Sequence, residues 1–404
     1  MMAMMMLLLA ICSLASATIL LSSNDAAVVV VRAQEEEKEE KKMIPVTVEL
    51  FGRAESDVTF AKYLSLAKAF NQFAHLRALT PLDQQNIVRM NRDTLYSPSI
   101  IDFAKCTPSG VTLIFPPADV IGDRFVSAMI VSQDHDIIAT KYPGDDNGEG
   151  IEITPSDVGT DKAFIGLRVF TDGSEEDLVK AHAVQDAFRI VPWNDAYESN
   201  GAEVDQETCE MSKEEYMAEV AMWDKDSLAT VRDLIKELQK HSNATSGEMF
   251  GPNRDEMNYL YYLFGTATGW GGQPPEDAVY IYGPPSDIDT SGDVAYQITI
   301  PTNDLPLKRN PATGEFIGFW SITVYDKDGF MEPNALEVNS INSATAKYDG
   351  DQVTITLAPE ATCVASPKNC IPITPSWNYI VRMYVPERSL IDGSYEAPKL
   401  QKME

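Results

Sequence analysis

Apolar residues recur every three or four positions between residues 57 and 79, which is the spacing of one face of an α-helix. The residues on this face are Phe60, Tyr63, Leu64, Ala67, Phe70 and Phe73. Ser56 precedes the pattern as a candidate N-cap, and Pro81 follows its end. The pattern predicts an amphipathic helix over residues 57–79.

Short alternating or continuous apolar runs predict β-strands on both sides of a central helical stretch. In the first part of the chain these runs cover residues 111–115, 124–132 and 163–170. In the last third they cover residues 278–282, 294–300, 319–325, 353–357 and 378–385. The Asp-Gly pairs at 328–329 and 349–350 predict hairpin turns between the later strands.

The middle of the chain is predicted to be helical. Ser174 opens a segment that resembles a capping box, and its helix should run to about residue 189. Ser212 opens a second such segment, whose helix extends toward residue 241 with a break near Asp226. A third helical stretch, near residues 253–268, stops at a group of glycines, Gly269, Gly271 and Gly272.

These patterns predict a mainly β protein with helical connections, of the α+β class. Turn signals replace the regular strand–helix alternation of a parallel sheet, so we expect two antiparallel β-sandwich or jelly-roll-like domains. The predicted boundaries are a signal peptide at 1–33, a disordered charged spacer at 34–44, an N-terminal β-rich domain at 45–173, a helical region at 174–272 and a C-terminal β-sandwich domain at 273–404.

The N-terminal segment predicts export. An apolar run leads to Val31-Arg32-Ala33, a small-x-small pattern that suits signal peptidase, and Ala15-Ser16-Ala17 is an earlier candidate. Cleavage after Ala17 or after Ala33 therefore stays open, with an uncleaved anchor as the alternative. The polar residues 22–25 divide the apolar part into runs too short to span a bilayer. We expect a secreted or periplasmic, extracytoplasmic protein with no membrane attachment after cleavage.

The charge balance excludes one class of partner. The 404 residues include 61 acidic and 32 basic side chains, which gives a formal net charge of −29. Nucleic acid binding needs a basic surface, so we expect no nucleic acid partner, and docking on anionic lipid is disfavoured for the same reason.

The cysteines and one sequon agree with an oxidising compartment. Cys363 and Cys370 bracket a short loop and are predicted to form a disulfide. Cys106 and Cys209 are either a second bridge or two free thiols. Asn243 begins the only Asn-x-Ser/Thr glycosylation sequon of the chain, which predicts a glycoprotein.

The most polar candidate for a site is the segment 88–97, which interleaves charged and apolar residues. In an extended segment Arg89, Asn91 and Asp93 would share one face, where they could bind a carboxylate or a sugar-like ligand. Tyr96, on the other face, is expected at the edge of this pocket. The alternative is a structural Arg89–Asp93 pair that ties a loop to the other domain.

His135 is the second candidate, because histidine is scarce and Asp134 and Asp136 flank it. A carboxylate facing the ring would raise its pKa and suit a general acid or base. The candidate catalytic set is therefore His135, Asp93 and Arg89. Neighbouring strand residues point to opposite sides, so the carboxylates need not touch the ring. A His–Asp pair could also ligate a metal, and the sequence leaves any metal or cofactor unknown.

Further candidate ligand contacts are aromatic or amide side chains. Trp270 lies on a glycine-framed turn and would either wall a ligand or plug the core. Asn334 is either a turn residue or a polar ligand contact. Trp320 and Trp377 lie in strand-like runs and are expected in the core, with sugar stacking as the alternative. The chain has no Gly-x-Ser-x-Gly elbow, His-x-x-x-His helix, Cys-x-x-Cys pair or glycine-rich phosphate loop.

Several segments, in order, resemble a known family. They are residues 88–97, 124–127, 134–135, 180–187, 265–267, 269–272, 318–325, 334 and 372–379. The chain resembles a two-domain secreted family of uncharacterised proteins, in which domain of unknown function 1254 is followed by domain of unknown function 1214. The resemblance covers roughly residues 45–400. It implies a secreted or periplasmic protein with two β-rich domains and helices between them, and it supplies no reaction.

Two functions are expected from these observations. The first is binding or transforming a small polar organic ligand in a pocket near the domain junction. The alternative is a non-catalytic carbohydrate- or surface-binding β-sandwich protein of the cell envelope. One pocket holding His135, Arg89 and Asp93 would favour an enzyme, and a row of aromatic residues on a sheet face would favour a binding protein. Enzymatic activity and homo-oligomer formation are left open.

Overall fold

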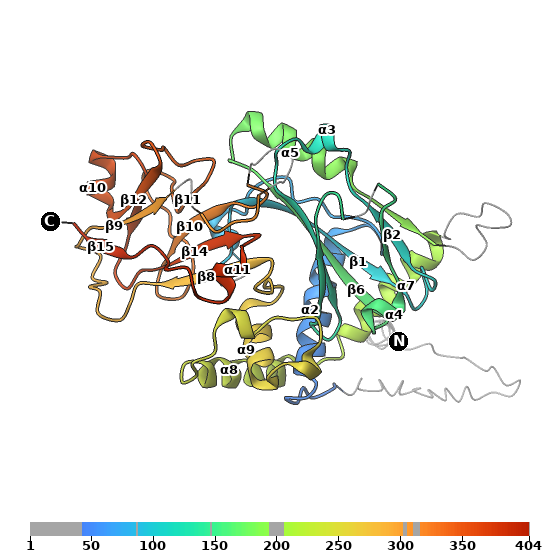
Figure 1. The fold of residues 1–404 in the computed structure, drawn as a ribbon. Helices are drawn as coiled ribbons and strands as arrows, with labels where there is room; N and C mark the ends of the chain where they lie inside the picture. Colours follow the sequence, from blue (N-terminus) through green and yellow to red (C-terminus); the bar gives the residue numbers. More distant parts are fainter. Residues whose placement is uncertain are drawn as a thin grey trace, which may run out of the picture. The chain divides into compact units, whose positions relative to one another are not determined.

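The computed structural model describes residues 43–85, 88–145, 148–193, 206–301, 305–309 and 316–403 (Figure 1). The expected signal peptide and nearly all of the expected spacer lie outside these residues. Within the chain, Ile44–Glu404 forms one compact unit.

The first β half contains two facing antiparallel sheets. One sheet has the order β1 (Thr94–Asp102), β6 (Lys162–Phe170), β3 (Val126–Ser132) and β4 (Ile137–Lys141). The other has the order β5 (Ile151–Ile153), β2 (Val111–Ile114) and β7 (Arg189–Pro192). The short helices α3 (Ala118–Ile121) and α4 (Pro155–Val158) and the longer α5 (Glu175–Ala187) connect these strands.

Side-chain alternation in β6 explains why this half has two different faces. Ile165 and Leu167 enter a core shared with the second sheet, which contributes Val111 and Leu113. The alternate residues of β6 include Phe164, which packs with helix α2 on the opposite face. A polar residue of β6 whose side chain points to the same face as Phe164 therefore lies outside the sandwich core.

The second β half also pairs two sheets over a shared core. The first has the order β11 (Ser340–Asn342), β10 (Trp320–Tyr325), β14 (Asn378–Tyr384) and β8 (Ala278–Gly283). The second has the order β13 (Cys370–Ile373), β12 (Gln352–Pro359), β9 (Tyr296–Pro301) and β15 (Leu400–Lys402). The short helices here are α10 (Glu360–Ala365) and α11 (Arg388–Ile391).

The mainly β, α+β prediction is confirmed, with one refinement. Strands β12 and β13 run parallel, so their sheet is mixed rather than purely antiparallel. Trp320 and Trp377 belong to the core between the two sheets and are each 1% exposed, as the core interpretation predicted.

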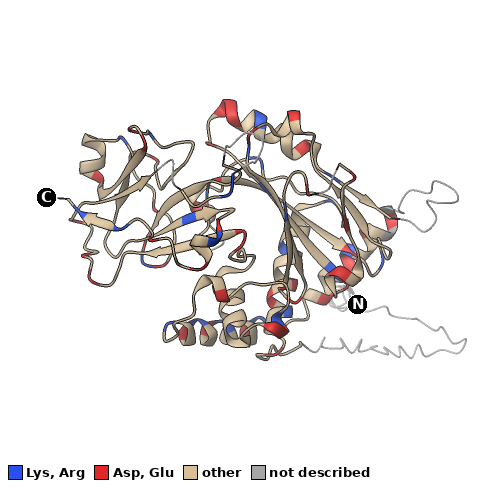
Figure 2. Ribbon diagram, in the orientation of Figure 1, with Lys and Arg blue, Asp and Glu red and all other residues tan. Residues whose placement is uncertain are grey.

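A group of helices packs on the outer face of β1 and β6. Its members are α2 (Phe51–Leu66), α7 (Gln206–Val220), α8 (Lys225–Gln239) and α9 (Tyr259–Gly269), with 3₁₀ turns at Ser246–Glu248 and Arg254–Glu256. A further 3₁₀ turn, Leu82–Gln84, packs against the second β half. Figure 1 shows α2 running along the sheet and α8 beside α9, and α2 contacts β1 as well as the other three helices. Acidic residues are spread over helices and loops rather than confined to one element (Figure 2).

The helix predicted over residues 57–79 is wrong at both ends. It begins at Phe51, so Ser56 is a buried interior residue rather than the N-cap, and it ends at Leu66. Beyond it, the backbone N–H groups of Asn71, Ala74 and Leu76 donate to carbonyl oxygens along β1. The periodic pattern continues past residue 66, but these strand contacts satisfy the backbone in place of helical bonds.

The other helix predictions hold more closely. The Ser174 side chain accepts from the backbone N–H of Asp177 and caps α5. The helix predicted to open at Ser212 begins earlier, at Gln206, so Ser212 is an interior residue of α7 and its hydroxyl donates to Asp102. A break divides the predicted helix into α7 and α8, and Asp224 caps α8 by accepting from the Ser227 N–H. Strand β1 was not predicted, because Pro98 and several polar residues interrupt its apolar run. Strands β4, β5, β7, β11, β13 and β15 were not predicted either, because each has five or fewer residues and shows little periodicity.

Both cysteine pairs are bridged. Cys363–Cys370 joins as predicted, and Cys106–Cys209 is a second bridge, which decides between the two alternatives for that pair. Their Cα atoms lie 5.3 Å and 5.2 Å apart, within the usual range for disulfides. Asn243 is exposed, and its glycosylation stays a prediction. No helix in the described ranges is long and apolar enough to cross a membrane.

The two bridges should differ in their contribution to stability. Their sequence separations are 103 and 7 residues, so loop-closure entropy predicts about 5 kcal/mol for Cys106–Cys209 and about 2.5 kcal/mol for Cys363–Cys370. Replacing each pair with serines and measuring urea unfolding should reproduce this order. A larger loss for the short loop would contradict it.

Candidate functional site

The segment that precedes β1 joins the two β halves. Asp93 is fully buried, and its Oδ1 accepts hydrogen bonds from Ser340 Oγ at 3.2 Å and from Asn342 Nδ2 at 3.0 Å. Both donors belong to β11 in the second half. The charged residue singled out from the sequence therefore lies in the junction between the halves.

Arg89 and Asp93 do not share a face, contrary to the expectation. β1 begins only at Thr94, and Arg89 has a left-handed backbone with a φ of 55°, so strand alternation does not apply before β1. Arg89 Nε donates to Asn378 Oδ1 at 3.3 Å, and no ion pair joins Arg89 to Asp93 in the described part of the chain. The proposed structural Arg89–Asp93 pair is wrong, and each residue contacts the second half separately.

A buried arginine of β14 holds the same segment from the other side. Arg382 donates through Nη2 to the Arg89 carbonyl oxygen at 2.6 Å and to the Tyr325 hydroxyl at 2.8 Å. Tyr325 in turn donates to the Met90 carbonyl oxygen at 2.8 Å. Burial lowers the pKa of Arg382, but the surrounding Tyr325 and Asp93 outweigh it and the pKa is raised. Arg382 is therefore protonated and fixes this turn through its hydrogen bonds.

Asn91 connects tyrosines from both halves. Its Oδ1 accepts from the Tyr96 hydroxyl at 3.1 Å, and its Nδ2 donates to the Tyr384 hydroxyl at 2.7 Å. Tyr96 lies on β1 and Tyr384 on β14. Asn91 and Tyr96, which strand alternation placed on opposite faces, are thus hydrogen-bonded to each other at this junction, and their ligand contact stays a prediction.

Arg168 is the functional candidate that the sequence reasoning missed. It pairs with Tyr96 on one neighbouring strand and with Ser127 on the other, so these side chains share the outer face of the sheet. It is 8% exposed, and its Nη2 donates to the Gly271 carbonyl oxygen at 3.1 Å. Burial lowers its pKa, but nearby tyrosines, Tyr96 first, outweigh it and raise the pKa. Among the described residues no carboxylate lies within ion-pair distance of this guanidinium.

The groups around Arg168 are rich in hydrogen-bond donors. Ser127 Oγ is buried and has no partner in the described part of the protein. The Tyr280 hydroxyl accepts from the Gln273 N–H at 3.3 Å, and the Tyr384 hydroxyl accepts from Asn91. Both phenols also act electrostatically on the guanidinium, and neither proton has an acceptor within the described residues. We call Arg168, Ser127, Tyr280 and Tyr384 the donor cluster.

His135 lies in a different setting from the one expected. It is 2% exposed, and the Gly271 N–H donates to its Nε2 at 2.9 Å. Its Nδ1 must then carry the proton and donate to Thr266 Oγ1 at 2.8 Å, since the Thr266 hydroxyl donates to the Tyr262 carbonyl oxygen. Burial lowers the pKa of His135 to about 3. The ring is neutral and both nitrogens are engaged.

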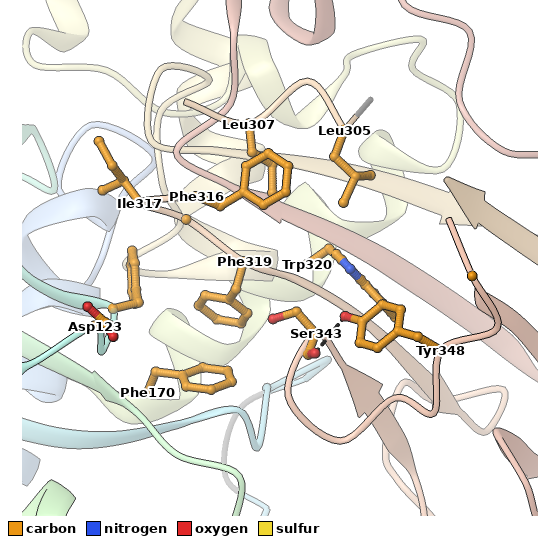
Figure 3. A pocket seen from close by; sticks show the side chains of 13 residues that line it. Asp123, Phe170, Leu305, Leu307, Phe316, Ile317, Phe319, Trp320, Ser343 and Tyr348 are labelled. Carbon is orange, nitrogen blue, oxygen red and sulfur yellow. Dashed lines mark hydrogen bonds between the residues drawn. The ribbon is translucent and has the colours of Figure 1, made fainter. Parts of the chain in front are cut away.

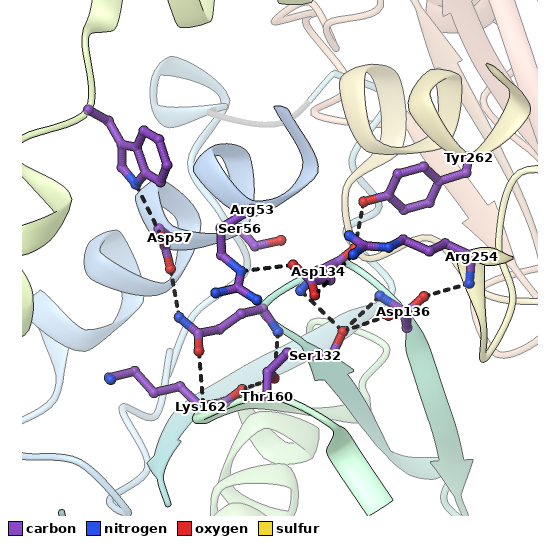
Figure 4. Close-up of polar contacts among 12 residues, drawn as sticks. Arg53, Ser56, Asp57, Ser132, Asp134, Asp136, Thr160, Lys162, Arg254 and Tyr262 are labelled. Carbon is purple, nitrogen blue, oxygen red and sulfur yellow. Dashed lines mark hydrogen bonds and ion pairs between the residues drawn. The ribbon is translucent and has the colours of Figure 1, made fainter. Parts of the chain in front are cut away.

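The carboxylates beside His135 hold its turn instead of charging its ring (Figure 4). Asp134 pairs with Arg53 at 2.8 Å and with Arg254 at 3.3 Å, and Asp136 accepts from the Arg254 backbone N–H at 2.7 Å. The expected rise in the pKa of His135 is therefore wrong. No group of three or more His, Cys, Asp or Glu that could hold a metal occurs in the described ranges.

Trp270 and His135 support the donor cluster from the helical side. The Trp270 ring lies 5.3 Å from the His135 ring, and its Nε1 donates to Ser56 Oγ at 3.1 Å. The next residue, Gly271, binds His135 through its N–H and Arg168 through its carbonyl oxygen. His135 thus positions the peptide that orients Arg168, although it lies outside the donor cluster itself.

Asn334 contributes to its own loop. Its Nδ2 donates to the Val338 carbonyl oxygen at 2.9 Å, and its Oδ1 accepts from the backbone N–H groups of Leu336 and Val338. Both ends of the amide are engaged within five residues, as the turn interpretation predicts.

The fold and site define a mainly β, α+β protein whose two β halves meet at a buried polar junction. The chain belongs to a two-domain family. Residues 70–192 match the family model described as a protein of unknown function (DUF1254), and residues 283–388 match the one described as a protein of unknown function (DUF1214). The two matches together cover more than half of the chain and confirm the resemblance seen in the sequence.

A solved structure shares this fold. The VPA0106 protein from Vibrio parahaemolyticus is 18% identical, with a TM-score of 0.55 over 88% of this chain and 100% of its own. An uncharacterised protein from Burkholderia cenocepacia is 13% identical, with a TM-score of 0.42 over 88% of each chain. A comparison with curated proteins found no significant match.

Removing the charge of Asp93 should destabilise the protein. Asp93→Asn keeps the acceptor for Ser340 and Asn342 but leaves Arg382 without its nearby negative charge, at a cost of about 2–4 kcal/mol. Urea unfolding measures this change. The exposed Asp328→Asn should stay within about 0.5 kcal/mol of the native protein. Equal effects of the two variants would contradict the structural role of Asp93.

His135 should make stability depend on acid pH. Its folded-state pKa lies below the ordinary 6.5, so below pH 6.5 the unfolded chain binds a proton at His135 that the folded protein does not bind. The contribution of neutral His135 to the free energy of unfolding is fully present above pH 6.5 and is lost as pH falls toward 3. Between pH 6.5 and 4.5 the free energy of unfolding should decrease by about 2 kcal/mol. His135→Asn, a residue that tolerates the φ of 62°, should remove this part of the pH dependence in urea unfolding. Parallel pH profiles would contradict it.

Proposed function

We propose that the protein binds a small organic molecule that carries a carboxylate, at the junction of its two β halves. The observation that supports this proposal is the donor cluster. The guanidinium of Arg168 donates to the Gly271 carbonyl oxygen and to the weak acceptor Sδ of Met129, and the protons of three surrounding hydroxyls have no acceptor among the described residues. A buried cation without a carboxylate partner is costly, and an anionic ligand would offset that cost.

The chemistry of the cluster favours a carboxylate over other polar groups. The guanidinium of Arg168 can donate two parallel hydrogen bonds to one carboxylate. The hydroxyls of Ser127, Tyr280 and Tyr384 would supply additional donors around the same anion, since each retains a proton. Tyr96 and Tyr280 are only half-buried, and Tyr282 is 57% exposed on the same strand as Tyr280, so the cluster borders solvent at these tyrosines.

The geometry supports binding rather than a particular reaction. His135 is neutral, buried and fully hydrogen-bonded, so it is a positioning residue and not the general acid or base that the sequence suggested. Sheet-face sugar stacking by Trp320 and Trp377 is disfavoured because both rings are buried. The disulfides agree with the proposed localisation of the protein outside the cytoplasm.

This proposal is tested by calorimetric titration with small aromatic and aliphatic carboxylates. The affinity of each carboxylate is compared with that of the corresponding primary amide. Carboxylates should bind more tightly than the amides, and Arg168→Met should weaken them by about 10-fold to 100-fold because charge-assisted bonds are lost. Arg388→Met removes an equal charge from a side chain that is 93% exposed, and it should leave binding unchanged. Equal losses in the two variants would contradict the proposal.

Ser127→Ala separates binding from folding. Its hydroxyl has no protein partner in the described chain, so its removal should leave the free energy of unfolding unchanged or higher. The same change should weaken carboxylate binding by about threefold to tenfold. A stable variant with undiminished affinity would remove Ser127 from the site.

A further inference from the structure

A cavity of about 440 Å³ opens between the two β halves, and Phe319 forms part of its wall (Figure 3). The first half contributes Asp123, Phe125 and Phe170. The second half contributes an apolar wall that includes Phe319 and Trp320. This volume falls within the range of pockets for small organic ligands.

Aromatic rings form a continuous wall of this pocket. Phe319 lies 4.6 Å from Phe170 and 5.1 Å from Phe125, measured between ring centroids. Behind it, Phe319 stacks on Tyr384 at 4.3 Å, and the Tyr384 hydroxyl belongs to the donor cluster. The Phe319–Tyr384 stack therefore separates the apolar pocket from the polar junction. Ring faces of this kind attract cations as well as apolar groups.

One carboxylate at the pocket is uncompensated. Asp123 is exposed at its rim, and no described residue donates to it or pairs with it. It also lines a neighbouring cavity of about 550 Å³, where the charged residues other than Asp119 are already paired, Asp177 with Arg124 and Lys180 with Glu176. The only negative groups left free in these two linings, within the described chain, are Asp123 and the more distant Asp119 of α3.

We propose that this pocket binds a small organic cation, with an aromatic or aliphatic body against Phe319 and a protonated amine beside Asp123. The net charge of −29 draws cations toward the protein, and no Lys or Arg occurs among the described residues that line this pocket, which disfavours anions there. The inference is independent of the carboxylate site, because it uses different side chains and a ligand of opposite charge.

A matched set of probes tests the inference: phenethylamine, neutral 2-phenylethanol and anionic 3-phenylpropionate share one ring and a similar chain. Calorimetric titration should find phenethylamine bound at least threefold more tightly than 2-phenylethanol, with a difference that shrinks at high salt. Asp123→Asn should remove the preference for the amine and leave 2-phenylethanol unaffected. Asp119→Asn removes the same charge nearby and should leave the preference intact.

Blocking the pocket locates the binding. Ser343 lines the cavity, and Ser343→Phe should abolish binding of phenethylamine and 2-phenylethanol while 3-phenylpropionate, if held at Arg168, still binds. A melting curve checks that this variant folds, and Asp123→Asn serves alone if it does not. The inference is overturned by undetectable phenethylamine binding at about 10 mM, by equal affinity for the amine and the alcohol, or by equal effects of Asp119→Asn and Asp123→Asn.

Discussion

Burial of charge at the junction of the two β halves is the constraint on which the rest of the structure depends. Asp93 and Arg382 are both almost free of solvent, and removing such groups from water is costly unless hydrogen bonds replace the lost hydration. Ser340 and Asn342 provide those bonds for Oδ1 of Asp93, whereas Oδ2 has no hydrogen-bond partner among the described residues and the nearby charge of Arg382 compensates it. Backbone carbonyl oxygens of the 89–90 turn accept hydrogen bonds from Arg382 and Tyr325. The second half therefore determines the conformation of a segment of the first.

The same junction gives different environments to two faces of one aromatic stack. On one side, the Tyr384 hydroxyl meets Asn91 and acts on Arg168, where donors exceed acceptors in the described chain. On the other, Phe319 faces an apolar pocket with Asp123 at its rim. A ligand with a negative charge would suit the side with Arg168, and a ligand with a positive charge would suit the side with Asp123.

His135 shows how a residue can be important without being chemically active. The sequence marked it by its rarity and by two neighbouring carboxylates, but those carboxylates bind Arg53 and Arg254 and stabilise a left-handed turn. The ring instead accepts from Gly271, whose carbonyl oxygen accepts from Arg168. Its contribution to the site is positional and passes through one peptide group.

The sequence by itself determined the local features of this protein: the strand-like runs, the Ser174 cap, the Cys363–Cys370 bridge and the mainly β class with its family. These depend on residues near one another in the chain, where periodicity and spacing carry the information. The outcomes that it did not determine all involve distant partners. The helix predicted to residue 79 ends at Leu66 because β1 accepts the following N–H groups. Arg168, placed opposite Leu167 by strand alternation, gains its role only from Gly271 and the tyrosines brought beside it. Such contacts join residues from about 20 to about 290 positions apart, and only the tertiary structure decides which of them form.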